Sequence, residues 1–475
     1  MTDCAVMFPG QGAYLPGALG PLAEDEPLVH ETLRELDAAA SRLGRGAPSR
    51  LLLDERAPSL ADLAASRPAD LHLALFAAET ALFRLLTERH GVRPRILIGH
   101  SFGELVALTA AGVYALEEGM ALVAARDEAF AACPPVDGGM VALAVSVTRA
   151  EGLLTGLGEW EVTVAADNSP RQCVVSGPSP ALERVREAAG KLGIDATPLR
   201  VPYAFHHRTL AAVAADFARR AGALRTAPPR HAVHSAILGR RLDGPDEVAD
   251  LVAAHLVRPT RFTDAVRRLY ADGVDVFVEC GPRGVLSDLV AATVPDVRVI
   301  APLRRRAGGR AVADALAGVA ASGTSAGASH VTSYATSSVT SHVTSYGTSQ
   351  VTSPAASTDA SSGSVPAEPL AGPAEKEEGT DPLADRAAVV ETLRALYAEA
   401  LGYPPEVLTG DADLEADLGV DSIKQTELFA QAAGRYGRTL PADGSRLTSY
   451  TTLDALAGLL NTLPALEPGA KEALA

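Results

Sequence analysis

The chain has 475 residues, of which 47% are hydrophobic, so it is long enough for about two to four domains with at least one large core. Its formal net charge of -16 argues against nucleic-acid binding, because a phosphate backbone is bound by a basic face. Four scattered cysteines favour neither a disulfide framework nor a metal site and suit a cytoplasmic protein. No basic leader follows Met1 and no run of about 18 apolar residues occurs, so we expect neither export nor a membrane span.

Residues 1–320 alternate short β-branched segments with longer Ala- and Leu-rich segments, which predicts an α/β sheet covered by helices. The segment FPGQGAY (8–14) comes first, and ILIGHSFGEL (96–105) is the most informative. It reads as a buried strand, a tight G-x-S-x-G turn and a helix, which predicts a nucleophilic serine, Ser101, at the tip of the turn. The amide of Phe102 then points toward a developing oxyanion at a helix N-terminus. Lipases and acyltransferases share this pattern, so it does not specify the acyl acceptor.

A smaller unit is predicted within the first one, at about residues 138–200. Its pattern is strand (140–146), helix, strand (162–166), strand (172–176), helix (181–192) and a strand near 197. This order is typical of a ferredoxin-like subdomain. Directly after it comes YAFHHR (203–208), which contains two adjacent histidines.

The remaining chain has a different composition. Residues 321–380 consist mainly of Ser, Thr, Ala, Gly and Pro, with a tetrapeptide repeat ending in Thr-Ser at 330–353, which predicts a disordered linker. Helical spacing of apolar residues returns at 389–401. An acidic loop then leads into DLGVDSIKQTELF (417–429), and a last helix is expected at about 453–460. We expect an all-α domain of four short helices at 381–465 and a tail at 466–475.

Motifs spread over residues 5–305 resemble the acyltransferase domains of fatty acid and polyketide synthases, the malonyl-CoA:acyl carrier protein transacylase family. Besides FPGQGAY, GHSFGE and YAFHH, these motifs are LVAARDEAF (122–130), AADNSPRQCVVSG (165–177) and FVECGPRGVL (277–286). The C-terminal helices resemble an acyl carrier protein, with DSIKQ at the family's attachment site. The resemblance implies a hydrolase-like core with an inserted ferredoxin-like subdomain, and an acyl pocket between them.

The resemblance also implies roles for individual residues. Ser101 is the nucleophile, and His206 is the general base, oriented by a backbone carbonyl rather than by a carboxylate. Gln11 and the amide of Phe102 form the oxyanion hole, and Arg126 binds the free carboxylate of a malonyl-type group. His100 and Asn168 line the pocket, although Asn168 also has a simpler interpretation as a turn residue.

Two residues of the YAFHH motif bear on substrate choice. In the family, HAFH accompanies malonyl and YASH accompanies methylmalonyl, because phenylalanine narrows the space that a 2-methyl group would enter. Phe205 therefore favours malonyl, whereas Tyr203 matches the methylmalonyl form. GHSFGE occurs in acyltransferases of polyunsaturated fatty acid synthases, which use malonyl, so malonyl is the preferred interpretation. His207 stands where the family usually has serine and is expected to be incidental.

In this interpretation, malonyl passes from malonyl-CoA to 4'-phosphopantetheine on Ser422 of the same chain or of a partner carrier. The partners implied are a phosphopantetheinyl transferase and a ketosynthase or other synthase component in trans. An acidic cluster in the carrier would offer these partners a docking surface; it comprises Asp411, Asp413, Glu415, Asp417 and Asp421. Two alternatives are an editing hydrolase, which would not need Arg126, and a docking module, which would not need Ser101 and His206.

Overall fold

The computed structural model describes residues 4–320, 386–401, 408–410, 414, 422–438 and 450–464. The chain divides into two compact units, with the boundary between Gly327 and Ala328. The predicted linker with its repeat, the acidic cluster at 411–421 and the tail at 466–475 lie outside the described residues. In the described ranges, no helix has both the length and the apolar character to cross a membrane. The same ranges contain no group of three or more His, Cys, Asp or Glu residues that could hold a metal ion.

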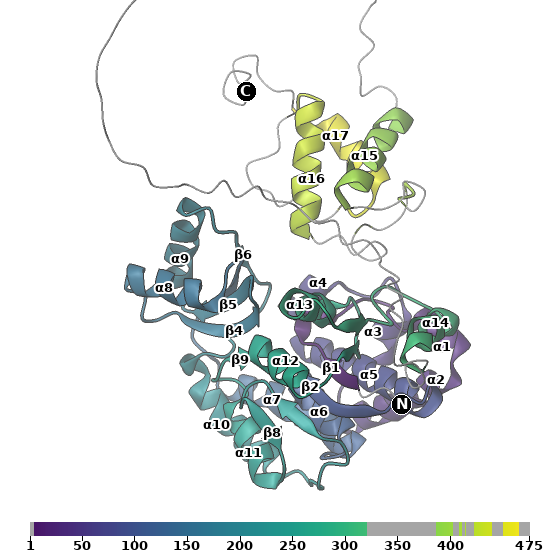
Figure 1. The fold of residues 1–475 in the computed structure, drawn as a ribbon, viewed down its shortest axis with the longest axis vertical. Helices are drawn as coiled ribbons and strands as arrows, with labels where there is room; N and C mark the ends of the chain where they lie inside the picture. Colours follow the sequence, from purple (N-terminus) through teal and green to yellow (C-terminus); the bar gives the residue numbers. More distant parts are fainter. Residues whose placement is uncertain are drawn as a thin grey trace, which may run out of the picture. The chain divides into compact units, whose positions relative to one another are not determined.

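The core of the first unit is a six-stranded sheet (Figure 1). Its strands, in spatial order, are β11 (Arg298–Ile300), β10 (Val276–Glu279), β1 (Cys4–Phe8), β2 (Pro94–Gly99), β7 (Val233–Ser235) and β8 (Arg240–Leu242). Neighbouring strands are parallel except β7 and β8, which are antiparallel. Val6 and Phe8 belong to one hydrophobic cluster and Ala5 and Met7 to another, so β1 is buried on both faces, as expected for a central parallel strand.

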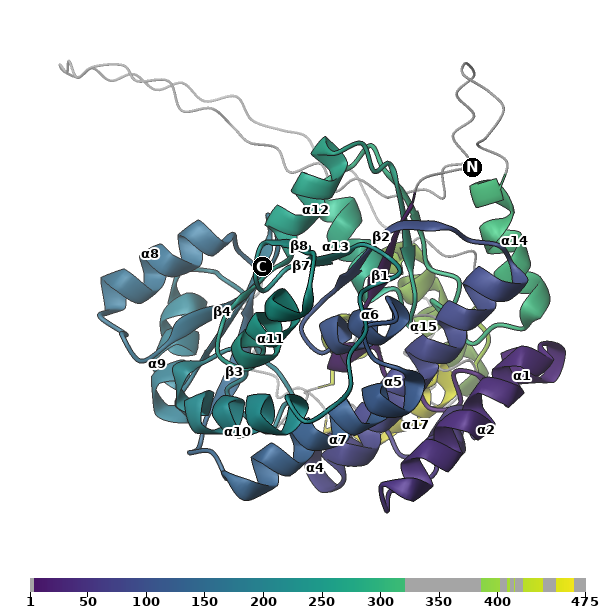
Figure 2. The same cartoon turned by 90° about the horizontal axis from the view of Figure 1, so that it is seen from below.

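Helices cover both faces of this sheet. On the Ala5 face lie α12 (Phe262–Ala271) and α13 (Val285–Thr293). The Phe8 face carries the larger core, built from α2 (Pro27–Arg42), α5 (Pro68–Arg84), α6 (Gly103–Ala110), α7 (Leu116–Ala132), α10 (Ala211–Ala221) and α11 (Pro245–Ala254). The remaining short elements are η1 (Gln11–Ala13), α1 (Gly20–Asp25), α3 (Ser49–Leu53), α4 (Leu60–Ser66), η2 (Leu85–Arg89), η3 (Arg208–Leu210) and α14 (Gly309–Ala320). Figure 2 shows α1, α2 and α14 on the side of the unit away from α8 and α9.

The ferredoxin-like prediction is confirmed. The elements are β3 (Gly139–Leu143), α8 (Val147–Leu157), β4 (Thr163–Ser169), β5 (Gln172–Gly177), α9 (Ser179–Lys191) and β6 (Ala196–Pro198). The strands are antiparallel in the order β6-β3-β5-β4, and β9 (Thr260–Arg261) adds to β4 in parallel. The first strand is shorter than predicted, because the Ser146 hydroxyl accepts a hydrogen bond from the Arg149 amide and caps α8.

The second unit contains three described helices, α15 (Arg386–Leu401), α16 (Ser422–Arg435) and α17 (Leu453–Thr462). They share one core, in which Tyr397 and Phe429 are fully buried. Buried Gln425 on α16 donates a hydrogen bond from Nε2 to the backbone carbonyl of Tyr450 at 2.6 Å. The backbone carbonyl of Gln425 accepts a hydrogen bond from the Tyr397 hydroxyl at 3.2 Å. A fourth predicted helix would fall outside the described residues.

The turn between β2 and α6 packs directly against the backbone of β1. A Cβ atom on Gly103 would lie 1.9 Å from the Phe8 carbonyl oxygen, and one on Gly99 would lie 2.2 Å from the Glu104 nitrogen. Both distances are far below van der Waals contact, and backbone cannot move aside as a flexible side chain can. Only glycine at these positions allows the turn to present residue 101 at the ends of the central strands.

We predict that Gly103→Ala lowers the free energy of unfolding by about 3 kcal/mol or more, because β1 must separate from the turn. Thermal and denaturant unfolding would measure this loss. The matched control is Gly152→Ala on α8, where a Cβ would have no atom within 4 Å. There alanine should add about 0.5 to 1 kcal/mol through helix propensity. Equal stability of the Gly103 variant and the wild type would contradict the packing described.

Candidate active site

Ser101 and His206 form a hydrogen-bonded pair. The Ser101 Oγ lies 2.7 Å from His206 Nε2, and His206 Nδ1 lies 2.8 Å from the Arg258 carbonyl oxygen. Since a carbonyl oxygen only accepts, Nδ1 carries the proton and Nε2 is free to accept from the serine hydroxyl. This is the arrangement that a nucleophile and its base require.

Both members of the pair have backbone conformations that L-residues rarely adopt. Ser101 has φ 53° and His206 has φ 59°. Such conformations cost of order 1–3 kcal/mol each and are found mainly at functional sites. The strain at Ser101 follows from the sharp turn between β2 and α6, and that at His206 aims the ring at the serine from the segment after β6.

Burial lowers the pKa of His206 to about 4, and the charges of His100 and Arg126 act in the same direction. The hydrogen bond to Arg258 opposes this shift. The imidazole is therefore neutral at pH 7 and ready to accept a proton. His206 is 4% exposed, so the neutral form follows from the closed site itself.

The adjacent His207 points elsewhere. Its Nε2 donates to the Glu161 carbonyl at 2.9 Å, and its Nδ1 accepts from the Thr209 hydroxyl at 2.9 Å. Both ring nitrogens are therefore used in holding the segment before β4 to the segment before α10. The structure thus gives the two adjacent histidines different partners.

A cavity of about 210 Å³ opens onto the pair. Gln11, Phe102, His100, Asn168 and Phe205 all line it. The Phe102 amide, at the N-cap of α6, makes no hydrogen bond within the part of the chain that the structure describes.

Asn168 links two sides of this cavity. It accepts a hydrogen bond from His100 Nε2 at 2.8 Å and donates one to Gln172 Oε1 at 2.9 Å. The residue lies in β4 and ties the turn around Ser101 to the ferredoxin-like subdomain.

Arg126, from α7, is the one feature of the cavity that implies an anionic ligand. Its side chain is 3% exposed, yet among the described residues Nε and Nη1 have no hydrogen-bond partner, and a carboxylate oxygen of Asp127 lies 3.7 Å from Nη1. The rings of Phe102, Phe130 and Phe205 lie 5.8, 5.3 and 5.1 Å from the guanidinium carbon. A planar, desolvated guanidinium with free donors is suited to a carboxylate.

Tyr203 does not line the cavity. Its ring stacks on Phe130 with centroids 4.5 Å apart and meets Phe205 edge to face at 5.9 Å. It therefore supports the two phenylalanines that contact Arg126. The mixed YAFHH motif thus separates into one residue in the cavity and one behind it.

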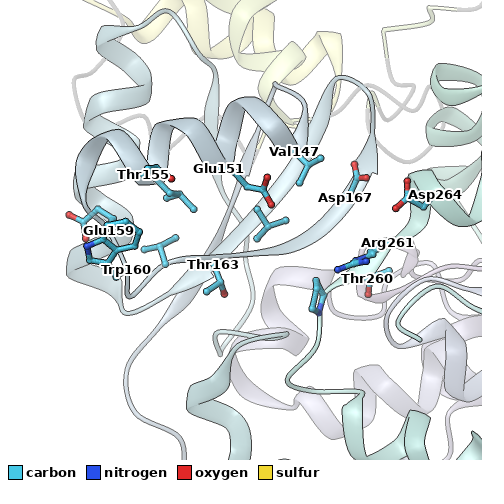
Figure 3. A pocket seen from close by; sticks show the side chains of 14 residues that line it. Val147, Glu151, Thr155, Glu159, Trp160, Thr163, Asp167, Thr260, Arg261 and Asp264 are labelled. Atoms are coloured by element: carbon cyan, nitrogen blue, oxygen red, sulfur yellow. The ribbon is translucent and has the colours of Figure 1, made fainter. Parts of the chain in front are cut away.

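A larger hollow of about 510 Å³ lies against α8 and β4 (Figure 3). Glu151, Asp167 and Asp264 are among the side chains that line it, together with Arg261 and the exposed Trp160. It contains neither Ser101 nor His206, so we assign the chemistry to the smaller cavity, which holds the nucleophile and its base.

The sequence analysis missed several residues of this site. Phe130 lies one helical turn after Arg126, and this spacing could have identified it. The apolar lining residues come from four separate segments of the chain, and no sequence pattern singled them out as pocket residues; they are Met140, Val174, Leu199, Val201, Val285, Leu286 and Leu289. His72 and Asp127, which contact Gln11 and each other in series, were also missed.

Comparison with known proteins agrees with this geometry. Residues 7–328 match the acyl transferase domain family and residues 391–460 match the phosphopantetheine attachment site family. The fold and the Ser-His pair define an acyl-transfer enzyme. More specifically, the chain belongs to the acyl transferase domain family and also contains a phosphopantetheine-dependent carrier domain, a combination of polyketide synthase type.

Among curated proteins, the chain is 38% identical over 286 residues to polyketide synthase GfsA of Streptomyces halstedii, covering 60% of this chain. It is 35% identical over 305 residues to erythronolide synthase EryA3 of Saccharopolyspora erythraea, covering 63% of this chain. These matches span only 4% and 9% of the two relatives.

Solved structures give the same picture. The acyltransferase domain of the second module of the salinomycin polyketide synthase is 34% identical with a TM-score of 0.59, covering 67% of this chain and 73% of that chain. A type II polyketide synthase malonyl-transacylase, solved with its acyl-carrier protein, is 26% identical with a TM-score of 0.60, covering 67% of this chain and 100% of that chain.

We predict that Arg126→Met raises the free energy of unfolding of the unliganded protein by about 1 to 3 kcal/mol, because it removes a buried charge without full compensation. Malonate should raise the melting temperature of the wild type, since it pairs with this charge in the folded state only, and should leave the variant unchanged.

Thermal unfolding with and without malonate measures both effects. Arg186→Met on α9 is the control, because Arg186 is exposed and its pairing with Glu183 contributes little. Loss of stability in Arg126→Met, or retained stabilisation by malonate, would contradict the assignment.

Proposed function

We propose that this chain transfers a malonyl group from malonyl-CoA, through an ester on Ser101, to the thiol of 4'-phosphopantetheine on Ser422. The acceptor carrier belongs to the same chain or to a partner. The observation that supports this most is the buried guanidinium of Arg126 in the cavity that holds Ser101 and His206, since its Nε and Nη1 have no hydrogen-bond partner among the described residues. A neutral acyl group would leave these donors unsatisfied and this charge only partly paired.

In the proposed acylation, Ser101 Oγ attacks the thioester carbonyl while His206 Nε2 accepts the serine proton. The Arg258 carbonyl holds the other ring nitrogen and stabilises the imidazolium. The negative charge on the former carbonyl oxygen is stabilised by the Phe102 amide and by Gln11. When the carbon–sulfur bond breaks, His206 returns the proton to the departing CoA thiolate. The products are the Ser101 ester and free CoA.

Ser422 is suited to the cofactor by its place in the fold. It is the first residue of α16, within the matched attachment-site region, and helix N-terminal amides favour a phosphate group. The bound cofactor supplies a terminal thiol as the acyl acceptor. His206 would accept the proton of the incoming thiol as its sulfur attacks the ester carbonyl, and would return that proton to Ser101 Oγ as the ester bond breaks, leaving the new thioester and the free serine.

The choice of malonyl over methylmalonyl rests on the aromatic rings around Arg126. Phe205 and Phe102 line the cavity of about 210 Å³, and together with Phe130, which is not among its lining residues, they surround the guanidinium. An extra methyl group would have to displace one of these rings, at a cost of about 1–3 kcal/mol.

We further propose a phosphopantetheinyl transferase and a ketosynthase in trans as partners.

The proposal is tested by converting the protein to its holo form, adding malonyl-CoA and following the intact mass. We expect a malonyl adduct on Ser422, and none in Ser101→Ala, because transfer requires the serine ester. Free malonate without an adduct would instead support the editing hydrolase, and no reaction would support a docking module. Methylmalonyl-CoA in parallel should react about 10-fold or more slowly.

We also predict that the pH profile of kcat/KM falls at a lower pH than is usual for a histidine base. Because the activity needs neutral His206 and its pKa is lowered to about 4, kcat/KM should be retained as the pH falls through the usual histidine range and decline only near pH 4. Initial rates of Ser101 acylation between pH 4 and 9 measure this profile. Recovery of the rate after return to pH 7 shows that the protein has not unfolded irreversibly in acid.

His207→Ala is the matched control and should keep both rate and profile, since its ring hydrogen-bonds to Glu161 and Thr209 rather than to Ser101. His206→Ala should abolish acylation. A midpoint near pH 6.5 in the wild type, or a greater loss in His207→Ala than in His206→Ala, would show that the wrong histidine has been assigned.

A further inference from the structure

A hydrogen-bonded series of three side chains reaches the oxyanion hole from behind. Asp127 on α7 accepts from His72 Nδ1 on α5 at 2.7 Å, and His72 Nε2 contacts Gln11 Nε2 on η1. All three groups are held by different elements. The series therefore connects η1, which follows β1, to two helices of the main core.

The chemistry of these groups fixes the direction of each hydrogen bond. A carboxylate only accepts, so His72 Nδ1 carries the proton that bonds to Asp127. In the neutral ring, His72 Nε2 must then accept, and the partner it faces is the amide nitrogen of Gln11. The Gln11 side chain is thereby held in one orientation, with its second N–H left for another acceptor.

His72 also contacts the second residue of the hole. Its ring stacks on Phe102 with centroids 5.5 Å apart and an interplanar angle of 24°. One buried histidine, 3% exposed, thus hydrogen-bonds to Gln11 and packs on Phe102. The same side chain thus contacts both residues that are assigned to the oxyanion hole.

We propose that His72, held by Asp127, is a positioning residue that fixes the Gln11 side chain for stabilising the oxyanion. This inference rests on the proposed function only in assigning the hole to Gln11 and Phe102. His72 contacts neither Ser101 nor the base, so its effect on the reaction passes through Gln11. Asp127 also lies 3.7 Å from Arg126, which places the carboxylate-binding residue beside the same series.

The test measures burst acylation of Ser101 by p-nitrophenyl acetate, which needs the oxyanion hole but neither malonyl nor Arg126. Removing one oxyanion donor costs about 10²–10³ in rate, so partial loss of positioning in His72→Phe should cost about 10-fold or more, with KM nearly unchanged. His72→Gln should retain most activity, because its amide can donate to Asp127 and accept from Gln11. His234→Phe, at another buried histidine on β7, controls for loss of packing.

The decisive comparison is a double-mutant cycle with Gln11→Ala. If His72 acts through Gln11, His72→Phe should have little further effect in the Gln11→Ala background. Multiplicative losses, or failure of His72→Gln to restore the rate at wild-type stability, would overturn the inference. Malonyl-CoA is assayed in parallel. If the double-mutant cycle with p-nitrophenyl acetate gives the expected result but no malonyl transfer occurs, malonyl-CoA is rejected as the donor and the role of His72 is retained.

Discussion

The hydrogen bond from His206 Nδ1 to the Arg258 carbonyl is the interaction on which the site depends. It fixes the proton on the ring nitrogen away from Ser101, so that Nε2 can act as a base without any carboxylate. Arg258 lies two residues before β9, which pairs with β4 of the ferredoxin-like subdomain. The same short segment thus orients the base and joins the inserted subdomain to the main sheet. Catalytic geometry and subdomain placement share one constraint.

The electrostatics of the cavity follow from its burial. Burial lowers the pKa of His206 and so holds the imidazole neutral, and the charge of Arg126 in the same cavity acts in the same direction. A bound carboxylate would pair with Arg126 and reduce its effect on His206. In the proposed function, the incompletely paired guanidinium is a local cost in stability of the kind that functional sites often carry.

Local patterns in the sequence predicted much of this structure. The strand–turn–helix around Ser101 and the succession of strands and helices along the ferredoxin-like subdomain depend on residues close together in the chain, and both were predicted correctly. The pairing of β9 with β4 was not predicted, because it joins two residues to a strand about 95 positions away. The series of Asp127, His72 and Gln11 was not predicted for the same reason, because it joins three elements that are far apart in the sequence. Tyr203 and Phe205 are two residues apart in the sequence, and only their packing shows that one lines the cavity and the other supports it.

The central claim is that the cavity selects an acyl group with a free carboxylate. Rapid-quench intact-mass measurement of Ser101 acylation tests it directly, with malonyl-CoA compared with butyryl-CoA, a neutral acyl group of similar size. We expect malonyl-CoA to acylate Ser101 faster by at least about 100-fold, because only its carboxylate pairs with the buried guanidinium of Arg126. Equal rates for the two thioesters would contradict the account.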